Sequence, residues 1–181
     1  MPVWQSIYEE LKDQNFELIS AAQDTGGEAA AGPIFATANV TYTALIDTKH
    51  TISSLYNLVN VPSGVWIDEE GRVVRIDEGT YTKSSVVLGR TIGNDAYVPA
   101  LRDWVKNGAE SEHILSPEEV AQHIRKRSDD AQRAEPAFKL AVHFFKNGDM
   151  DRANTYWDKA QELNPDSWNF HRQDWSFLDP Q

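Results

Sequence analysis

The sequence predicts an α/β domain followed by a helical extension, and two observations support this fold class. Up to about residue 77, segments in which apolar residues recur at helical spacing alternate with short apolar runs that are typical of strands. Beyond residue 115 the signals are helical only. Because alternating helices and strands form a sheet covered by helices, we expect residues 1–109 to form the α/β domain and residues 110–181 the extension.

The first part of the α/β domain is expected to contain two helices and two strands. An amphipathic helix is predicted over residues 3–14, where four apolar side chains recur at helical spacing: Trp4, Ile7, Tyr8 and Leu11. The mostly apolar run 16–22 predicts a buried strand. An alanine-rich helix is expected at about 27–37, and a short extended segment at 43–47.

The stretch 59–75 is the most informative part of the chain, because it predicts a β-hairpin entered through a proline turn. A helix that contains Ile52 and Leu55 must stop before Pro62, since the residue before a proline avoids the helical region. Strands are expected at 64–68 and 72–77. Between them Gly71 supplies the positive φ that such a turn requires.

The remaining α/β segment leads to a predicted boundary. Residues 78–96 are rich in Thr, Ser, Gly and Asp, and we expect them to be mainly loop. A helix over residues 97–106 should end at Gly108. Ser116, Pro117 and Glu119 then form a helix-start motif, which places a domain boundary near 109–116.

The helical extension resembles one tetratricopeptide repeat, a pair of helices with small, large and breaker residues at fixed spacing. The matching residues are Ala137, Leu140, Ala141, Phe144, Gly148, Ala153, Trp157, Ala160 and Pro165. We expect Phe144 and Trp157 to fill the space between the two helices. One repeat cannot bury its apolar face alone, so the helix that begins at Pro117 and the aromatic tail 168–177 should supply neighbours. The tail either forms a structural cap or contributes to a groove for a peptide or protein partner.

Composition and charge exclude several function classes. A net charge of -11 argues against nucleic acid as a partner, because phosphate neutralisation needs a basic face. The basic cluster Arg125-Lys126-Arg127 is followed by two aspartates and is interpreted as a solvated helix face. No apolar run approaches the ~20 residues that span a bilayer, so we expect no membrane insertion. The amino terminus as given has no basic region followed by an apolar run, which predicts a cytoplasmic protein.

The residue types that usually carry redox or metal chemistry are absent or scattered. The chain contains no cysteine, which excludes disulfides, zinc–thiolate sites and a thiol nucleophile within it. Its five histidines show no metal-ligand spacing. We therefore predict no metal, no cofactor and no catalytic residue in this chain.

Residues 1 to about 107 resemble a TlpA/ResA-type thioredoxin-like domain of the redoxin superfamily, which includes peroxiredoxins of the alkyl hydroperoxide reductase/thiol-specific antioxidant group. The matching stretches are residues 3–14, 16–24, the segment at Asp47, 56–62 and 67–71. The resemblance implies a three-layer α/β domain. It also implies a cis proline at Pro62, and a substrate-docking role for Val61, whose backbone would bind a substrate peptide. Taken without the family, Pro62 is a turn proline that precedes a strand.

This chain departs from the family at the redox centre. Family members carry a CxxC pair at the start of their first helix, where the helix dipole lowers the thiol pKa. Residues 1–4 resemble the sequence that follows this pair, so the first strand and the active-site turn are missing on this alignment. Either the natural protein begins upstream and is a thiol–disulfide oxidoreductase or antioxidant, or the chain is a redox-inactive relative kept for binding.

These two alternatives have further consequences. An upstream start implies an extracytoplasmic protein, as for the exported relatives, in which a thiolate attacks a disulfide and a second thiol resolves it. Loss of the first strand would leave unpaired sheet edges, which predicts an altered sheet or a homodimer. The alternative function is a non-catalytic interaction module that uses the scaffold and the helical repeat to hold a protein partner.

Overall fold

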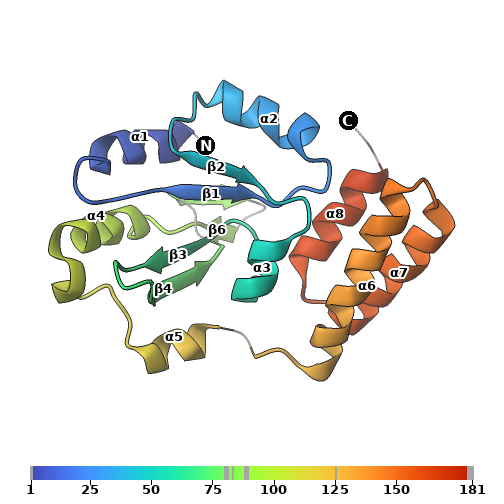
Figure 1. Cartoon of the computed structure of the whole chain (residues 1–181). Helices are drawn as coiled ribbons and strands as arrows, with labels where there is room; N and C mark the ends of the chain where they lie inside the picture. Colours follow the sequence, from blue (N-terminus) through green and yellow to red (C-terminus); the bar gives the residue numbers. More distant parts are fainter. Residues whose placement is uncertain (1, 80–81, 83, 88–89, 125, 179–181) are drawn as a thin grey trace.

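An α/β region lies beside a bundle of three helices formed by residues 129–178 (Figure 1). The structure is a computed structural model, and it describes residues 2–79, 82, 84–87, 90–124 and 126–178. Within this part of the chain the strands form three separate two-stranded sheets. The architecture is therefore mixed α/β with small sheets and a carboxyl-terminal helical region.

Apart from β5 and β6, the α/β region follows the predicted order of elements. Its helices are α1 (Pro2–Leu11), α2 (Glu28–Thr37), α3 (Thr51–Tyr56), α4 (Tyr97–Asn107) and α5 (Pro117–His123), with a short 3₁₀ turn η1 (Gly108–Glu110) after α4. Its strands are β1 (Ile19–Ala22), β2 (Thr43–Ile46), β3 (Ser63–Ile67), β4 (Val73–Glu78), β5 (Ser85–Val87) and β6 (Arg90–Ile92). The helical region contains α6 (Asp129–Lys146), α7 (Met150–Leu163) and α8 (Trp168–Leu178).

The strand pairs differ in direction. β1 and β2 pair in parallel, with Ile19 opposite Thr43. β3 and β4 form the predicted antiparallel hairpin, with a register shift after Trp66. Its turn has the expected chemistry: Gly71 has a φ of 79°, and Asp68 Oδ1 accepts hydrogen bonds from two backbone N–H groups of the turn.

One expectation about the strands is wrong, and one strand pair was not predicted. The segment around β1 was expected to be buried, but Ile19 is 61% exposed, because each strand of a two-stranded sheet lies at an edge. Residues 78–96 were expected to be mainly loop, and within them the short strands β5 and β6 form an antiparallel pair. The Ser, Thr and Gly content of this segment concealed the β-branched residues that pair there.

One hydrophobic core joins α1 and α4 to the β3–β4 hairpin. Ile7, Leu11 and Leu101 are buried around Trp66, whose ring stacks on Trp104 with centroids 5.0 Å apart. The Trp66 Nε1–H group donates a hydrogen bond of 2.7 Å to the hydroxyl of Tyr97. Burial raises the pKa of Tyr97 to about 12, so this hydroxyl stays protonated at physiological pH.

A second core forms between α6, α7 and α8. Ala141 and Ala160 are fully buried, which lets α6 and α7 approach closely. The predicted filling residues are only half right: Trp157 is buried, but its partner is Phe138, with ring centroids 5.2 Å apart. Phe144 is instead half-buried near the end of α6, where Tyr156 and Arg152 pack against its ring.

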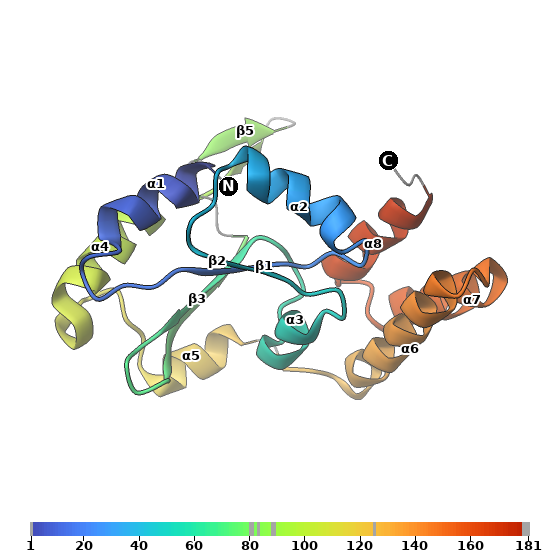
Figure 2. The same ribbon diagram turned by 45° about the horizontal axis from the view of Figure 1, so that its top comes forward.

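The neighbours of this helix pair were also predicted in part. α8 does pack there, with Phe170 stacked on Phe138 at 4.6 Å between centroids. α5 was expected to do the same, but it packs against β4, and the backbone N–H of Leu115 donates to the carbonyl of Val74. Figure 2 shows α5 on the far side of α3 from α7. The helix-start motif at Ser116 is present as predicted, with both hydrogen bonds of the capping box.

Candidate functional site

Val61 and Pro62, the predicted substrate-docking residues, form the entry to β3. The peptide bond between them is cis, the isomer that the resemblance implies, and both side chains are half-buried. The Val61 N–H donates to Oδ1 of Asn60 at 2.8 Å, and the Pro62 carbonyl accepts from the N–H of Gly79 at 2.7 Å. The Val61 carbonyl accepts no hydrogen bond from any residue that the structure describes. A peptide N–H that reached this carbonyl could donate a hydrogen bond to it.

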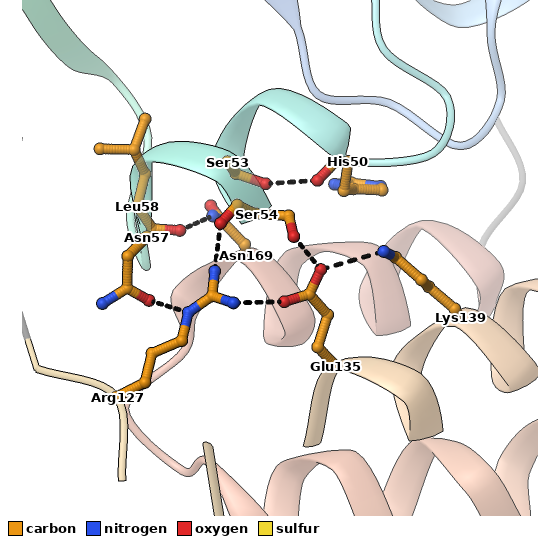
Figure 3. Close-up of polar contacts among 9 residues, drawn as sticks. All are labelled: His50, Ser53, Ser54, Asn57, Leu58, Arg127, Glu135, Lys139 and Asn169. Atoms are coloured by element: carbon orange, nitrogen blue, oxygen red, sulfur yellow. Dashed lines mark hydrogen bonds and ion pairs between the residues drawn. The ribbon is translucent and has the colours of Figure 1, made fainter. Parts of the chain in front are cut away.

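A second polar site lies where the chain leaves β2, at the junction of α3 with α6 and α8 (Figure 3). In open α/β sheets, ligands bind beyond the carboxyl ends of the parallel strands. A small cavity of about 40 Å³ lies at this junction. Its lining includes residues from all three helices and from the segments that flank them: His50, Ser54, Asn57, Arg127, Glu135 and Asn169.

Arg127 connects the segment before α6 to α3. Its Nε–H donates to Oδ1 of Asn57 at 2.6 Å, and a terminal N–H donates to the backbone carbonyl of Ser54. The other terminal nitrogen lies 3.0 Å from Glu135. The interpretation of the basic cluster as a solvated helix face is thus wrong for Arg127, which precedes α6 and points at α3 (Figure 3). Arg125 lies outside the described residues.

Glu135 is the anionic centre of this network. Burial alone would raise the pKa of its carboxyl, but hydrogen bonds from the Ser54 hydroxyl and from Lys139, together with the charge of Arg127, lower it below its usual value. Lys139 lies 3.0 Å away, one turn along α6. The carboxylate consequently stays ionised and connects α6 to both Arg127 and α3.

Asn169, in the first turn of α8, makes two contacts with the segment after α3. Its backbone N–H donates to the carbonyl of Val59 at 3.2 Å, and its side-chain Nδ2 donates to the carbonyl of Leu58 at 2.8 Å. The side chain is buried, and its Oδ1 atom has no hydrogen-bond partner. The bond to Leu58 fixes the amide orientation, since a flipped amide would place two oxygens together.

Gln173 of α8 and His50, which precedes α3, both contact Thr25 in the turn between β1 and α2. The backbone N–H of Thr25 donates to Oε1 of Gln173 at 3.0 Å, and the Thr25 hydroxyl lies 3.1 Å from Nε2 of His50. The His50 ring packs edge-on against Phe138, with centroids 4.9 Å apart. Burial lowers the pKa of His50 below its ordinary value, against an opposing contribution from Asp47. The ring is therefore neutral at neutral pH.

These groups can form hydrogen bonds to a ligand and hold neighbouring segments in position. The chain has no cysteine, and the described residues contain no group of three or more His, Asp or Glu side chains arranged to hold a metal ion. Sequence reasoning assigned Arg127 to a solvated face and did not single out Asn169, because their contacts lie 70 and 111 positions away along the chain. No local pattern encodes such a pairing.

Comparison of the chain with protein-family models, with curated proteins and with solved structures finds no match. Among the described residues, no helix combines the length and the apolar composition needed to cross a bilayer.

Proposed function

We propose that this chain is a thioredoxin-like protein of the redoxin superfamily with a tetratricopeptide-like extension, and that it holds an extended peptide at Val61 and Pro62. The family role is thiol–disulfide exchange or peroxide reduction, which requires a cysteine thiolate. This chain has no cysteine. Its own residues therefore bind a peptide without exchanging disulfides with it.

The observation that supports the proposal is the order and direction of the elements. Helix α1 is followed by the parallel pair β1–β2, then by α3, the antiparallel hairpin β3–β4 and helix α4. The hairpin packs on α4 through Trp66, Tyr97 and Trp104. This is the order that the resemblance implies after the first strand of such a domain.

Peptide docking is tested by nuclear magnetic resonance with labelled protein and short extended peptides. We expect shift changes centred on residues 59–64, because the Val61 carbonyl can accept a hydrogen bond from a peptide N–H. The matched control is the same peptide with that one amide N-methylated, which cannot donate. Equal binding by both peptides, or shift changes confined to other surfaces, would contradict docking at this turn.

The family role is tested by reduction of insulin disulfides. We expect no turnover by this chain, because it carries no thiol. Turnover by a version extended upstream of Met1 would support the oxidoreductase role. Turnover by neither version would favour the second candidate function.

That second candidate is a non-catalytic interaction module. The observation that favours it is the set of polar contacts at the junction, which hold the helical region against the α/β region rather than presenting a reactive group. In either case we propose a peptide or protein partner, and self-association through open sheet edges.

A further inference from the structure

We propose that Arg127 and Asn169 are positioning residues: through them the helical region holds the segment 54–59 in place and so sets the geometry of the turn at Val61 and Pro62. The inference rests on the proposed peptide docking at that turn. It adds that docking depends on residues of the carboxyl-terminal helices, far from the turn in sequence.

The contacts that Arg127 and Asn169 make with segment 54–59 are called the clamp. This segment needs such contacts because α3 is short. α3 has only six residues and ends at Tyr56, and the next residue, Asn57, has a φ of 53°. The last carbonyls of a helix have no partner within it, and a helix this short cannot persist alone. The carbonyl of Ser54 accepts the backbone N–H of Asn57 at 3.3 Å, and Arg127 supplies a second donor to it. The guanidinium also places a positive charge at the carboxyl end of α3, where the helix dipole favours cations.

Asn169 extends the clamp toward the docking turn. Its two hydrogen bonds engage the consecutive carbonyls of Leu58 and Val59. Only Asn60 separates Val59 from Val61, and the side chain of Asn60 is itself bonded to the Val61 N–H. The hydrogen bonds that fix the backbone at Leu58 and Val59 therefore also restrict the backbone at Val61, which follows Val59 by two residues.

The geometry of α8 makes this contact dependent on correct docking of the helical region. Asn169 lies one residue before Phe170, which stacks on Phe138 in the helical core. Gln173, one turn further along α8, binds the backbone N–H of Thr25. α8 is thus fixed on one side to the helical core and on the other to two loops of the α/β region.

The test uses the variant N169D in the full-length chain. This near-isosteric change keeps the backbone contact to Val59 but replaces the donor to Leu58 with an acceptor. The control for the change of charge is N147D, since the Asn147 side chain also donates to a backbone carbonyl, that of His143 at the end of α6. N169D and N147D change the net charge equally. Asn147 is exposed whereas Asn169 is buried, so R127K is measured beside N169D.

Two readouts are measured, amide hydrogen exchange and peptide affinity. Exchange follows the local opening equilibrium, and we expect N169D to accelerate exchange at residues 57–61 about tenfold, the effect of one lost hydrogen bond. We expect peptide affinity to fall by a similar factor, and N147D to change neither. R127K, which keeps the charge but loses the forked contacts, should act as N169D does and serves as a second variant if N169D folds poorly.

The outcomes separate the inference from the proposed function. Unchanged exchange at residues 57–61 in both N169D and R127K, or an equal change in N147D, would overturn the clamp. Accelerated exchange with unchanged peptide affinity would overturn its link to docking. Absence of peptide binding by the unaltered chain would contradict the proposed function, while the exchange experiment would still test the clamp.

Discussion

His50 shows how a single side chain can link the two regions of this protein. Its ring is 5% exposed, lies against Phe138 of α6 and reaches the hydroxyl of Thr25. Its Nδ1 atom is buried without a partner. A neutral ring fits this environment, whereas an imidazolium would be desolvated there.

The stability of the protein should therefore fall as the pH drops below about 6.5, the pKa of an exposed histidine. Because burial lowers the pKa of His50 in the folded state, the unfolded chain binds the proton first. Stability is then full above the unfolded pKa and is lost toward the lower, folded one. Asp47 and Asp24 oppose the shift and Lys146 reinforces it.

The measurement is the melting temperature at pH 7.5 and pH 5.5, for the unaltered chain and for His50→Gln. We expect the unaltered chain to lose stability between these values and His50→Gln to lose less. Asp47 and Glu135 have lowered pKa values, so their contribution is lost only below about pH 4.3. A pH dependence unaffected by His50→Gln would show that another group is responsible.

Tyr97 offers a second residue-scale prediction. Tyr97→Phe removes the acceptor for Trp66 Nε1 and should lower the free energy of unfolding by about 1–3 kcal/mol, the cost of an unpaired buried donor. The control is Tyr8→Phe in α1, whose ring packs edge-on against Tyr42. Urea denaturation should show a clear loss for Tyr97→Phe and a smaller one for Tyr8→Phe.

At the scale of elements, local signals were the ones that could be read from the sequence. The capping box at Ser116, the glycine turns at Gly71 and Gly148 and the helix end at Gly108 all lie where the sequence predicts them. Each of these features depends on residues that are only a few positions apart. The same local sequence therefore produces both the recognisable pattern and the structure. The β3–β4 hairpin was predicted for this reason.

Most of the features that were missed depend on distant partners. The pairing of β5 with β6 is the local exception, because its strands have only three residues each and lie in a polar segment without clear alternation. Phe138 rather than Phe144 fills the helical core, because α8 and His50 approach the face on which Phe138 lies. Of the candidate site, the proline turn could be predicted, whereas Arg127 and Asn169 depend on how the helical region docks.

Phe138 provides the element-scale prediction. It is 1% exposed and contacts Trp157, Phe170 and His50. Phe138→Ala should destabilise the protein by about 3–5 kcal/mol, as is typical for a buried phenylalanine. Phe144→Ala, at the half-buried position, should cost clearly less. Similar losses for the two variants, measured by urea denaturation, would contradict this assignment of the core.

The whole molecule has two hydrophobic cores joined by a largely polar junction. One core lies between α1, α4 and the hairpin, the other between α6, α7 and α8. In Figures 1 and 2, α3 lies between the β1–β2 sheet and α6. At the junction His50 packs on Phe138, and hydrogen bonds join Gln173 to Thr25 and Asn169 to Leu58.

At the scale of the whole molecule, the sheets predict self-association. Among the described residues, β1 pairs only with β2 and β3 only with β4, and isolated two-stranded sheets are marginal in water. Open edges with exposed apolar residues such as Ile19 and Leu45 favour pairing with another chain. We therefore expect a homodimer, strengthened by salt because each chain carries a charge of -11.

Sedimentation velocity across a concentration series, at low and at moderate salt, measures this association. Ile19→Lys places a charge on β1 at a position that is already 61% exposed, so it should weaken the dimer with little effect on folding. Ile34→Lys is the matched control, because Ile34 is 58% exposed but lies on α2, away from the strand edges. A monomer at every concentration and salt would show that the edges are covered within one chain. Equal weakening by both variants would place the interface on another surface.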